Sequence, residues 1–544
     1  MIRRLGMWFV TIIAVASSFS LLSYAQPVQL LTRHVRPATQ NGEAKPLGRL
    51  PATQSLGLDI VLPLSDRTGL ESFLEELYDP YSALYRQFLT VEEFTARFGP
   101  SQEQYDAVLR FAEANNLTVV GGSRDAMDVQ VKGTVAAIDA AFHIVLGVYQ
   151  HPTENRAFYA PNREPSVDLP FQLWHISGLD NFSIPRPALL HNDNAMPLAI
   201  TGSCPGQSFC GSDMRAAYYG GKTLTGAKQN VGLLEYAGFD IDDVNTYYQN
   251  AGQTRTAAVT GISTDGTSID CVYPSCDDTE QTLDITQALG MAPGLTTVYM
   301  YVGSTDTALL GSMSTHKPLP AQLSASWIWS PSDPSTDDPY FMKMAAQGQN
   351  YFQASGDDGK FNSSYPTWPC DSAYVTSVGG TDLETTGPGG AWKSETAWID
   401  GGGGFWAADN IPLPNWQKAM VQHCSQCSQT YRNAPDVSAN SNFTFYVCAD
   451  QRGCTANEYG GTSFAAPMWA GYLALLNQKA AAVGHKLLGF INPTVYGLGL
   501  SAGYDNFFND VTSGSNGYPA GPGYDLATGW GSPKAGNPLL GTLE

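Results

Sequence analysis

Hydrophobic and polar positions in the first part of the chain predict a small unit of strands and helices. Residues 58–62 form a short apolar run typical of a strand, whereas 70–77 and 102–114 carry apolar residues at the three- and four-residue spacing of amphipathic helices. The same patterns predict strands over 117–120, 127–131 and 144–149 and a third helix over 135–142. We therefore expect a compact α+β unit between residues 58 and 160.

The second part of the chain contains more continuous apolar runs. Residues 230–234 (Asn-Val-Gly-Leu-Leu) and 297–302 (Thr-Val-Tyr-Met-Tyr-Val) are separated by segments that we expect to be helical. Strands that are apolar on both faces and alternate with helices are typical of a largely parallel sheet covered on both sides. The pattern therefore predicts an α/β domain.

The two parts meet in a stretch that is rich in Pro, Asn, Gly and Ser. Residues 185–212 show no apolar period, so this stretch is expected to contain an exposed linker open to proteolysis. A chain of 544 residues is also several times the usual size of one domain. We divide it into a first domain over 26–190, a linker with a processing site over 191–212 and a second domain over 213–544.

The first 25 residues have the three parts of a secretory signal. Arg3 and Arg4 precede an apolar run over 7–22, and residues 23–25 end on the small residues expected before a signal-peptidase cut. The apolar run is shorter than the roughly 20 residues that span a bilayer. We therefore expect a secreted, extracellular protein without a stable membrane anchor.

The charge of the chain excludes one class of partner. A net charge of −21 argues against nucleic acid, because proteins bind its phosphates through basic surfaces. The same balance is compatible with an acidic environment, where carboxylates are neutral and few basic groups remain to repel one another. An ordinary secreted surface is the alternative, and composition does not distinguish the two.

All nine cysteines follow residue 200, so disulfide bonds are expected in the second part only. Short spacings predict three local pairs, namely Cys204 with Cys210, Cys271 with Cys276, and Cys448 with Cys454. For the remaining residues we expect a bond from Cys370 to Cys424 or Cys427. A metal bound by the last two cysteines beside His423 is the alternative.

The segment 460–467 (Gly-Gly-Thr-Ser-Phe-Ala-Ala-Pro) places Ser463 at the expected start of an apolar helix. Backbone N–H groups at a helix start stabilise negative charge, which makes Ser463 a candidate nucleophile. A helix cap is the alternative role for this serine. Only His316, His423 and His485 follow residue 200, and none has the context expected of a catalytic base. A carboxylate is therefore the expected proton acceptor.

Glu280 and Asp284 are the candidate carboxylates. They lie four residues apart in a segment expected to be helical, so both project from one face. Two neighbouring carboxyl groups have separated pKa values because ionising both costs repulsion. One can then accept a proton while the other orients it. The apolar residues around them indicate burial, although a solvated acidic helix face is the alternative.

These motifs together resemble the sedolisin family of serine-carboxyl peptidases. Residues 88–94, 97–100 and 137–142 are also similar to the activation domain of that family. The resemblance implies an α/β peptidase domain with a subtilisin-like, largely parallel sheet flanked by helices. It further implies that an α+β, ferredoxin-like prodomain precedes this domain.

The resemblance assigns roles to further residues. Asp357, in Ser-Gly-Asp-Asp-Gly, matches the aspartate that stabilises the oxyanion, for which its carboxyl group must be protonated. A simple Gly-Asp turn is the alternative. Glu235 and Trp327 match residues that form hydrogen bonds behind the catalytic glutamate. They are expected to support the site without taking part in the chemistry.

The C-terminal segment resembles the calcium site of the family. One structural Ca²⁺ is expected, held by the carboxylates of Asp510 and Asp525 and by the carbonyl groups of Val511, Gly521 and Gly523. A glycine-rich turn without calcium is the alternative.

The family resemblance thus predicts a secreted, acid-acting endopeptidase that is made as a zymogen and cleaves proteins or peptides. Its prodomain is expected to act as inhibitor and folding partner until acid neutralises carboxylates at the interface and the linker is cut. We expect a monomer. The alternatives are a tripeptidyl-peptidase of the same family, a catalytically inactive binding protein on the same scaffold, and an ordinary histidine-dependent protease.

Overall fold

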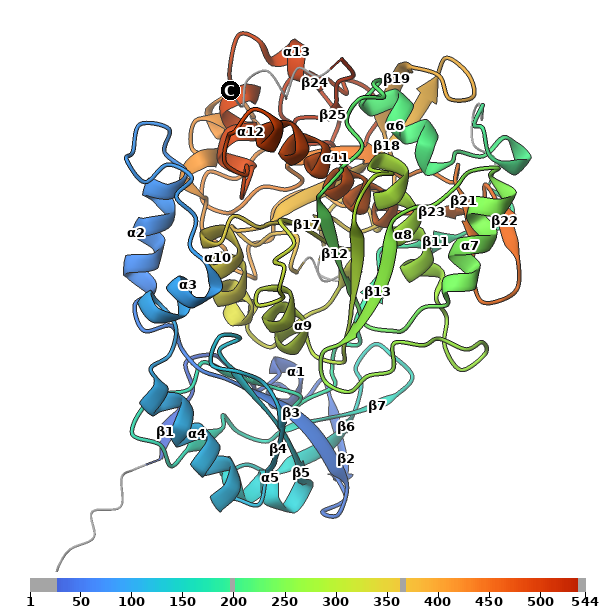
Figure 1. Ribbon diagram of the computed structural model, residues 1–544. Helices are drawn as coiled ribbons and strands as arrows, with labels where there is room; N and C mark the ends of the chain where they lie inside the picture. The colour runs from blue at the N-terminus through green and yellow to red at the C-terminus, as the bar shows by residue number, and fades with distance from the viewer. Residues whose placement is uncertain (1–26, 196–200, 363–367, 537–544) are drawn as a thin grey trace, which may run out of the picture.

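The computed structural model describes residues 27–195, 201–362 and 368–536, and the predicted signal sequence lies outside these residues. An N-terminal part, blue to cyan in Figure 1, lies against one side of a larger part coloured green to red. Across the described ranges, no helix has both the length and the apolar character needed to cross a bilayer.

The N-terminal part is built on a four-stranded antiparallel sheet in the order β4-β5-β3-β9. This is the strand order of a ferredoxin-like fold, as expected. The strands are β3 (Ser55–Val61), β4 (Thr118–Gly121), β5 (Asp128–Thr134) and β9 (His175–Ser177). Side chains of α4 (Gln102–Ala114) and α5 (Val135–Ala141) pack against this sheet. A second sheet joins β2 (Lys45–Arg49), β6 (Leu146–Gln150) and β7 (Ala157–Pro161).

The larger part contains an eight-stranded sheet whose strand pairs are all parallel except that between β18 and β19. The strands are β12 (Asn230–Glu235), β13 (Ala258–Ser263), β14 (Thr297–Val302), β15 (Gln322–Ala325), β17 (Asn350–Ala354), β18 (Thr376–Thr385), β19 (Trp392–Ala397) and β20 (Val437–Asn440). The predicted α/β architecture is confirmed.

Helices cover both faces of this sheet and belong to two hydrophobic cores. One core includes α6 (Gly211–Tyr218), α7 (Ile241–Asn250), α8 (Thr279–Met291), α11 (Thr462–Ala482) and α12 (Asn492–Gly499). The other includes α9 (Asp306–Met313) and α10 (Asp338–Ala346). The buried α8 and α11 carry the candidate catalytic residues.

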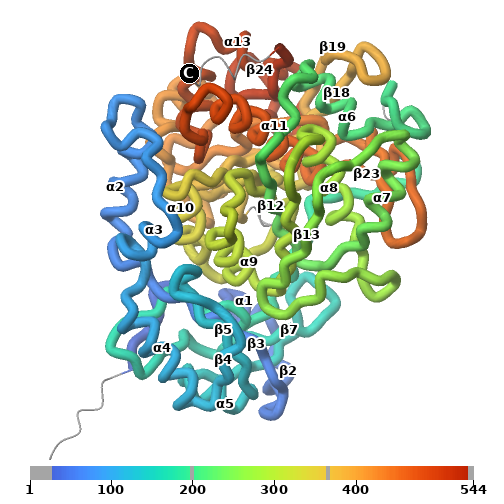
Figure 2. Tube along the Cα trace, in the orientation of Figure 1, coloured from blue at the N-terminus to red at the C-terminus, as the bar shows by residue number. Residues whose placement is uncertain are grey.

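The second core is shared between the two parts of the chain. Apolar side chains of α2 (Arg67–Leu77) and α3 (Val91–Arg97) enter it beside those of α9 and α10. Both views show α2 and α3 alongside α10 (Figures 1 and 2). Because Phe94 and Phe341 are fully buried in this common core, the N-terminal part and the sheet domain stabilise each other.

Four disulfide bonds close short loops. The three predicted local pairs are present. The prediction for Cys370 was wrong, since Cys424 bonds to Cys427 and the buried thiol of Cys370 instead contacts the Ser355 carbonyl, with Sγ and O 3.8 Å apart. A turn in which the Cys427 N–H donates to the Cys424 carbonyl brings these two cysteines together. Their bond also uses both thiols that the metal alternative required.

Candidate active site

Ser463 lies in the first turn of α11 and is fully buried. Gly461 is the capping residue of this helix, so Ser463 does not serve as the cap. The short strand β23 (Tyr459–Gly460) leads into the helix and fixes where it starts. The Ser463 hydroxyl group therefore points to the edge of the sheet, where its Oγ lies 3.5 Å from the Ser326 carbonyl oxygen.

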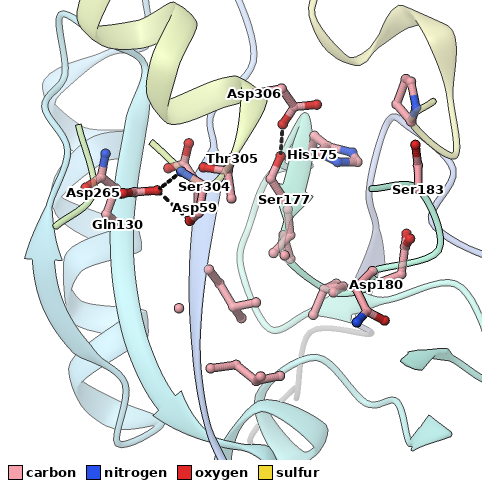
Figure 3. Close-up of a pocket in the computed structure, with 18 of the residues that line it drawn as sticks. Asp59, Gln130, His175, Ser177, Asp180, Ser183, Asp265, Ser304, Thr305 and Asp306 are labelled. Atoms are coloured by element: carbon pink, nitrogen blue, oxygen red, sulfur yellow. Dashed lines mark hydrogen bonds between the residues drawn. The ribbon is translucent and has the colours of Figure 1, made fainter. Parts of the chain in front are cut away.

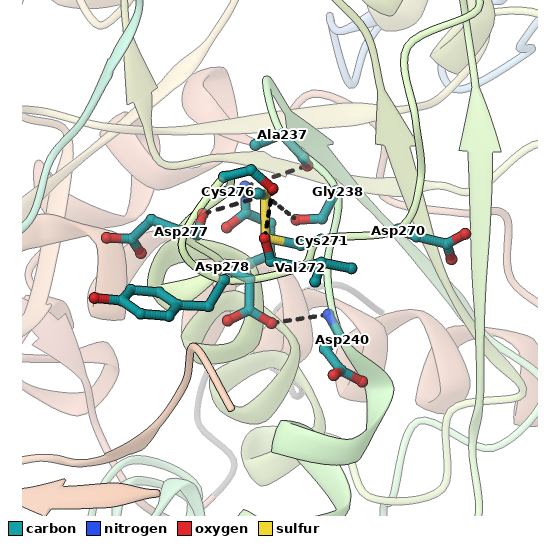
Figure 4. The surroundings of a disulfide bond; sticks show 12 residues. Ala237, Gly238, Asp240, Asp270, Cys271, Val272, Cys276, Asp277 and Asp278 are labelled. Carbon is teal, nitrogen blue, oxygen red and sulfur yellow. Dashed lines mark hydrogen bonds between the residues drawn. A yellow bond between two sulfur atoms is a disulfide. The ribbon is translucent and has the colours of Figure 1, made fainter. Parts of the chain in front are cut away.

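Glu280 and Asp284 lie on consecutive turns of the buried helix α8, which packs along α11. The loop before α8 is tied down at several points, as Figure 4 shows. The Cys271–Cys276 disulfide closes it, and the Asp278 carboxylate accepts hydrogen bonds from the backbone N–H groups of Asp240 (2.8 Å) and Asp450 (2.7 Å). Such anchoring holds the first turn of α8, and therefore Glu280, in place.

The carboxyl groups of Glu280, Asp284 and Glu235 form a buried acidic series. Burial raises the pKa of Glu280 well above its usual range, and the charge of Asp284 raises it further. Burial likewise raises the pKa of Asp284, with a second contribution from the charge of Glu235. The hydroxyl groups of Ser463 and Ser326 act in the opposite direction on Glu280. At a given pH, these three carboxyl groups therefore carry less negative charge than three exposed carboxyl groups would.

Hydrogen bonds orient the members of this series behind Ser463. The Ser326 hydroxyl donates to Asp284 Oδ1 (2.8 Å), and the Trp327 indole N–H donates to Glu235 Oε2 (2.9 Å). Within the described residues, no hydrogen bond of good geometry reaches either oxygen of Glu280, although the Ser463 and Ser326 hydroxyl groups lie near enough to lower its pKa. Asp284 Oδ2 and Glu235 Oε1 also lack a partner there, so Glu280 is the member of the three with both oxygens open to a proton.

Asp357 lies on the loop after β17 and is tied to the residue before Ser463. Its Oδ1 accepts hydrogen bonds from the Thr462 N–H (2.8 Å) and hydroxyl (2.9 Å). Its Oδ2 is buried and has no hydrogen-bond partner among the described residues. Burial raises the pKa of Asp357 well above its usual range. When protonated, Oδ2 is a buried hydrogen-bond donor without an acceptor among the described residues.

The chain itself crosses the site. In β10 (Arg186–Pro187) it pairs antiparallel with β16 (Trp327–Ile328), and in β11 (Leu190–His191) it pairs antiparallel with β23. Between these strands, the backbone N–H of Ser463 donates to the Ala188 carbonyl oxygen (3.2 Å). This segment was missed in the sequence; only Pro185 and Pro187, which favour extended backbone, could have indicated it.

The structure brings all six predicted peptidase-site residues to one edge of the sheet. Glu235 ends β12, Trp327 follows β15, and Asp357 follows β17, so these residues lie at the carboxyl ends of parallel strands, where α/β proteins place their sites. The remaining three lie on α8 and α11. His316 instead packs on the ring of Tyr299, with centroids 4.3 Å apart. No hydrogen bond in the described ranges joins a histidine to Ser463.

The predicted calcium ligands surround a glycine-rich loop near the C-terminus. Asp525 accepts hydrogen bonds from the N–H groups of Gly521 (2.9 Å) and Thr528 (2.8 Å), while Asp510 accepts from the Tyr504 hydroxyl (3.0 Å). Neither carboxylate takes part in an ion pair among the described residues. Carboxylates without a cationic side chain suit Ca²⁺, but the contacts of Gly521 and Gly523 with these two aspartates are made by their N–H groups and not by their carbonyl groups.

A separate cavity of about 610 Å³ lies between the two parts of the chain (Figure 3), and Ser463 does not line it. The Ser177 hydroxyl donates to Asp306 Oδ1 across this boundary (3.0 Å), and the Thr307 hydroxyl donates to Asp59 Oδ2 (2.5 Å). Burial raises the pKa of both Asp59 and Asp306. The cavity therefore belongs to the interdomain contact and not to the candidate active site.

Two family models match separate parts of the chain. The model of the Pro-kumamolisin activation domain matches residues 43–182, and that of the subtilase family matches 292–489. Kumamolisin from Bacillus sp. (strain MN-32) is 28% identical over 93% of this chain and 94% of its own length. Tripeptidyl-peptidase 1 from Canis lupus familiaris is 25% identical over 90% of this chain and 92% of its own length.

The solved structure of Pseudomonas sedolisin, complexed with two molecules of pseudo-iodotyrostatin, superposes with a TM-score of 0.52. It shares 26% sequence identity and covers 62% of this chain and 96% of that chain. Fold and comparisons together define a serine peptidase with a subtilisin-like domain and an N-terminal activation domain. Over most of its length the chain is similar to sedolisin-type serine-carboxyl peptidases.

Proposed function

We propose that this peptidase is a secreted, acid-acting endopeptidase in which Ser463 is the nucleophile, Glu280 the general base and Asp284 its positioning partner. Asp357 and the Ser463 N–H would stabilise the oxyanion. One observation carries the proposal furthest. A Cβ atom placed on Gly461 would lie 2.3 Å from the Ala188 carbonyl oxygen and 2.8 Å from Asp357 Oδ2, so a peptide carbonyl and the aspartate lie beside the same backbone atom.

The chemistry follows from these positions. Glu280 accepts the proton of the Ser463 hydroxyl as Oγ bonds to the scissile carbonyl carbon, and the carbonyl electrons move onto its oxygen. The oxygen receives hydrogen bonds from the Ser463 N–H and the protonated Asp357. Glu280 then gives its proton to the leaving amine as the C–N bond breaks. Water repeats the sequence on the acyl-enzyme, which restores the serine.

An endopeptidase is favoured over a tripeptidyl-peptidase by the path of the chain through the site. The segment that pairs with β16 and β23 continues in both directions, to the N-terminal domain before Arg186 and to residues 192–195 after His191. A cleft that accommodates chain on both sides of the reacting carbonyl suits cleavage within a polypeptide. Release of tripeptides requires a barrier that stops the peptide beyond the third residue before the cleaved bond.

Acid has little effect on two exposed ion pairs of the interface, Arg33–Asp333 and Lys317–Glu92. Burial raises the pKa of Asp333, but hydrogen bonds from Ser335 and from the Arg33 backbone outweigh this effect and lower it. Asp333 also pairs with the Arg33 side chain, with Oδ2 and Nε 3.4 Å apart. The Lys317 ammonium group likewise lowers the pKa of the exposed Glu92. Exposed pairs of this kind contribute little to stability. We therefore expect cutting of the chain, more than neutralisation of these pairs, to free the cleft.

The uncut precursor should become more stable on acidification. Burial raises the folded-state pKa of Asp59, Asp306 and Asp337, so their contribution to stability is complete below the unfolded pKa and is lost as pH rises through the folded pKa. We expect the melting temperature of Ser463→Ala precursor to fall by several degrees between pH 5 and pH 8. Asp59→Asn, which cannot ionise, should flatten this slope. A melting temperature that rises over this range would contradict the account.

Calcium should stabilise the processed enzyme through Asp510 and Asp525. A ligand present at a hundredfold excess over its Kd contributes about 2.7 kcal/mol to the free energy of unfolding. Chelation is therefore expected to lower the melting temperature by several degrees, and Ca²⁺ should restore it better than Mg²⁺. Asp525→Asn should remove this response, whereas Asp270→Asn, which removes an exposed carboxylate elsewhere, should keep it. An unchanged melting temperature after chelation of wild type argues for the calcium-free turn.

A further inference from the structure

The segment from Arg186 to His191 lies across the candidate active site and is held there by backbone hydrogen bonds. The Ala188 N–H donates to the Ser326 carbonyl (2.8 Å), and the Ala188 carbonyl accepts from the Ser463 N–H (3.2 Å). Strand pairing continues this contact on both sides, with β16 before Ala188 and with β23 after Leu189. The bond between Ala188 and Leu189 therefore lies at the proposed nucleophile. Each neighbouring side chain of the segment shows where the corresponding side chain of a bound peptide would lie.

The third residue before this bond, Arg186, meets a carboxylate that the proposed chemistry does not use. Its Nη2 donates to Asp358 Oδ2 at 2.6 Å. The side chains are 38% and 22% exposed, so the pair is partly shielded from water. A charged hydrogen bond in such a place contributes more than one at an open surface.

Asp358 is placed firmly enough to discriminate between substrates. It directly follows Asp357, whose carboxylate is held by two hydrogen bonds from Thr462. The backbone that carries Asp358 is thus fixed relative to Ser463 by the same contacts that position the oxyanion donor. A carboxylate with a fixed position relative to the reacting carbonyl can discriminate between bound peptides. It does so by the charge of the residue that takes the place of Arg186.

We propose that Asp358 selects peptides with Arg or Lys at the third residue before the cleaved bond, and that the enzyme first cuts its own precursor between Ala188 and Leu189. The inference rests on the proposed role of Ser463. It places the cut inside the segment that crosses the cleft, before the 191–212 linker predicted from composition. A cut there would separate Arg186 from the peptidase domain and leave Asp358 open to basic residues of other chains.

Matched peptides test the selectivity. We would use quenched fluorescent peptides that carry Ile-Pro-Arg-Pro-Ala-Leu-Leu-His, the sequence of residues 184–191, together with versions that carry Ala or Glu in place of Arg. For the acid-processed wild type, we expect kcat/KM for the Arg peptide to exceed that for the Ala peptide by about tenfold. Asp358→Asn should bring this ratio close to one, and Asp358→Lys should make the Glu peptide the better substrate. Asp270→Asn controls for the loss of one negative charge and should keep the wild-type ratio.

The ratio is measured within each variant, so a general loss of activity does not obscure it. Equal cleavage of the Arg and Ala peptides by wild type, or an unchanged preference in Asp358→Asn, would overturn the selectivity. Failure of the proposed function gives a different result. In that case, wild type cleaves none of the peptides, or cleavage persists in Ser463→Ala.

The first product of processing tests the bond. Precursor is brought to acid pH and sampled over the first minutes, and the new N-terminus is identified by mass spectrometry. We expect the earliest peptidase-domain product to begin at Leu189 and to form at a rate independent of precursor concentration. Ser463→Ala precursor should yield none. An earliest product that begins at another residue would overturn the assignment of the bond, while leaving the selectivity to the peptide assay.

Discussion

Replacing Ser463 by Ala is expected to abolish peptide hydrolysis, with a loss on the order of 10⁶-fold in kcat as found when a serine nucleophile is removed. Glu280→Gln should reduce kcat by roughly 10²- to 10⁴-fold, because the amide keeps the shape of the side chain but cannot take the serine proton. Both rates are measured with a quenched peptide at the acid optimum of wild type. The two losses should not add in the double variant, because serine and base act in one step.

A histidine variant provides the matched control. His316, His423 and His485 are the only histidines beyond residue 200, and the triple change to Asn should retain activity. Substantial activity in Glu280→Gln, or its loss in the triple histidine variant with the fold intact, would show that the proton acceptor has been misassigned. Circular dichroism and the melting temperature distinguish such a loss from unfolding.

Two substitutions of Asp357 should have different effects, one mainly on kcat and the other mainly on the pH dependence of activity. Asp357→Ala removes a donor to the oxyanion and is expected to lower kcat by roughly 10²- to 10³-fold. Asp357→Asn can keep the bond from Thr462 through its amide oxygen and still donate through its amide nitrogen. It should therefore retain more activity than the alanine variant.

The pH dependence of Asp357→Asn is the more informative result. In wild type, activity falls as pH rises through the pKa of Asp357, because the ionised carboxylate no longer donates a hydrogen bond. Burial raises this pKa, so the limit lies above the usual range of an aspartate. An asparagine stays a donor at every pH, and the alkaline limb should move to higher pH. An alkaline limb that does not move would mean that another group controls it.

Local patterns were enough to predict most of the elements that support the site. Residues 297–302 and 102–114 form β14 and α4 with the predicted bounds. In α4 the reciprocal capping of Ser101 and Gln104 fixes the start of the helix independently of distant contacts. The four-residue spacing of Glu280 and Asp284 likewise placed both carboxyls on one buried helix.

Contacts between distant parts of the sequence could not be predicted in this way. The segment around Ala188 is too short and too rich in proline to show a strand pattern, and it becomes ordered only by pairing with residues 327–328 and 459–460. A role for Asp358 could not be predicted, because its partner, Arg186, lies far away in the sequence. The Cys424–Cys427 bond depends on a tight turn that spacing alone does not specify.

The pH profile of kcat/KM for the processed enzyme tests the central claim most directly, with wild type measured beside Ser463→Ala and Glu280→Ala. A serine that is activated by a carboxylate and assisted by a protonated aspartate should work only at acid pH, and both variants should be inactive across the range. A neutral optimum, or activity that survives Glu280→Ala, would contradict the account.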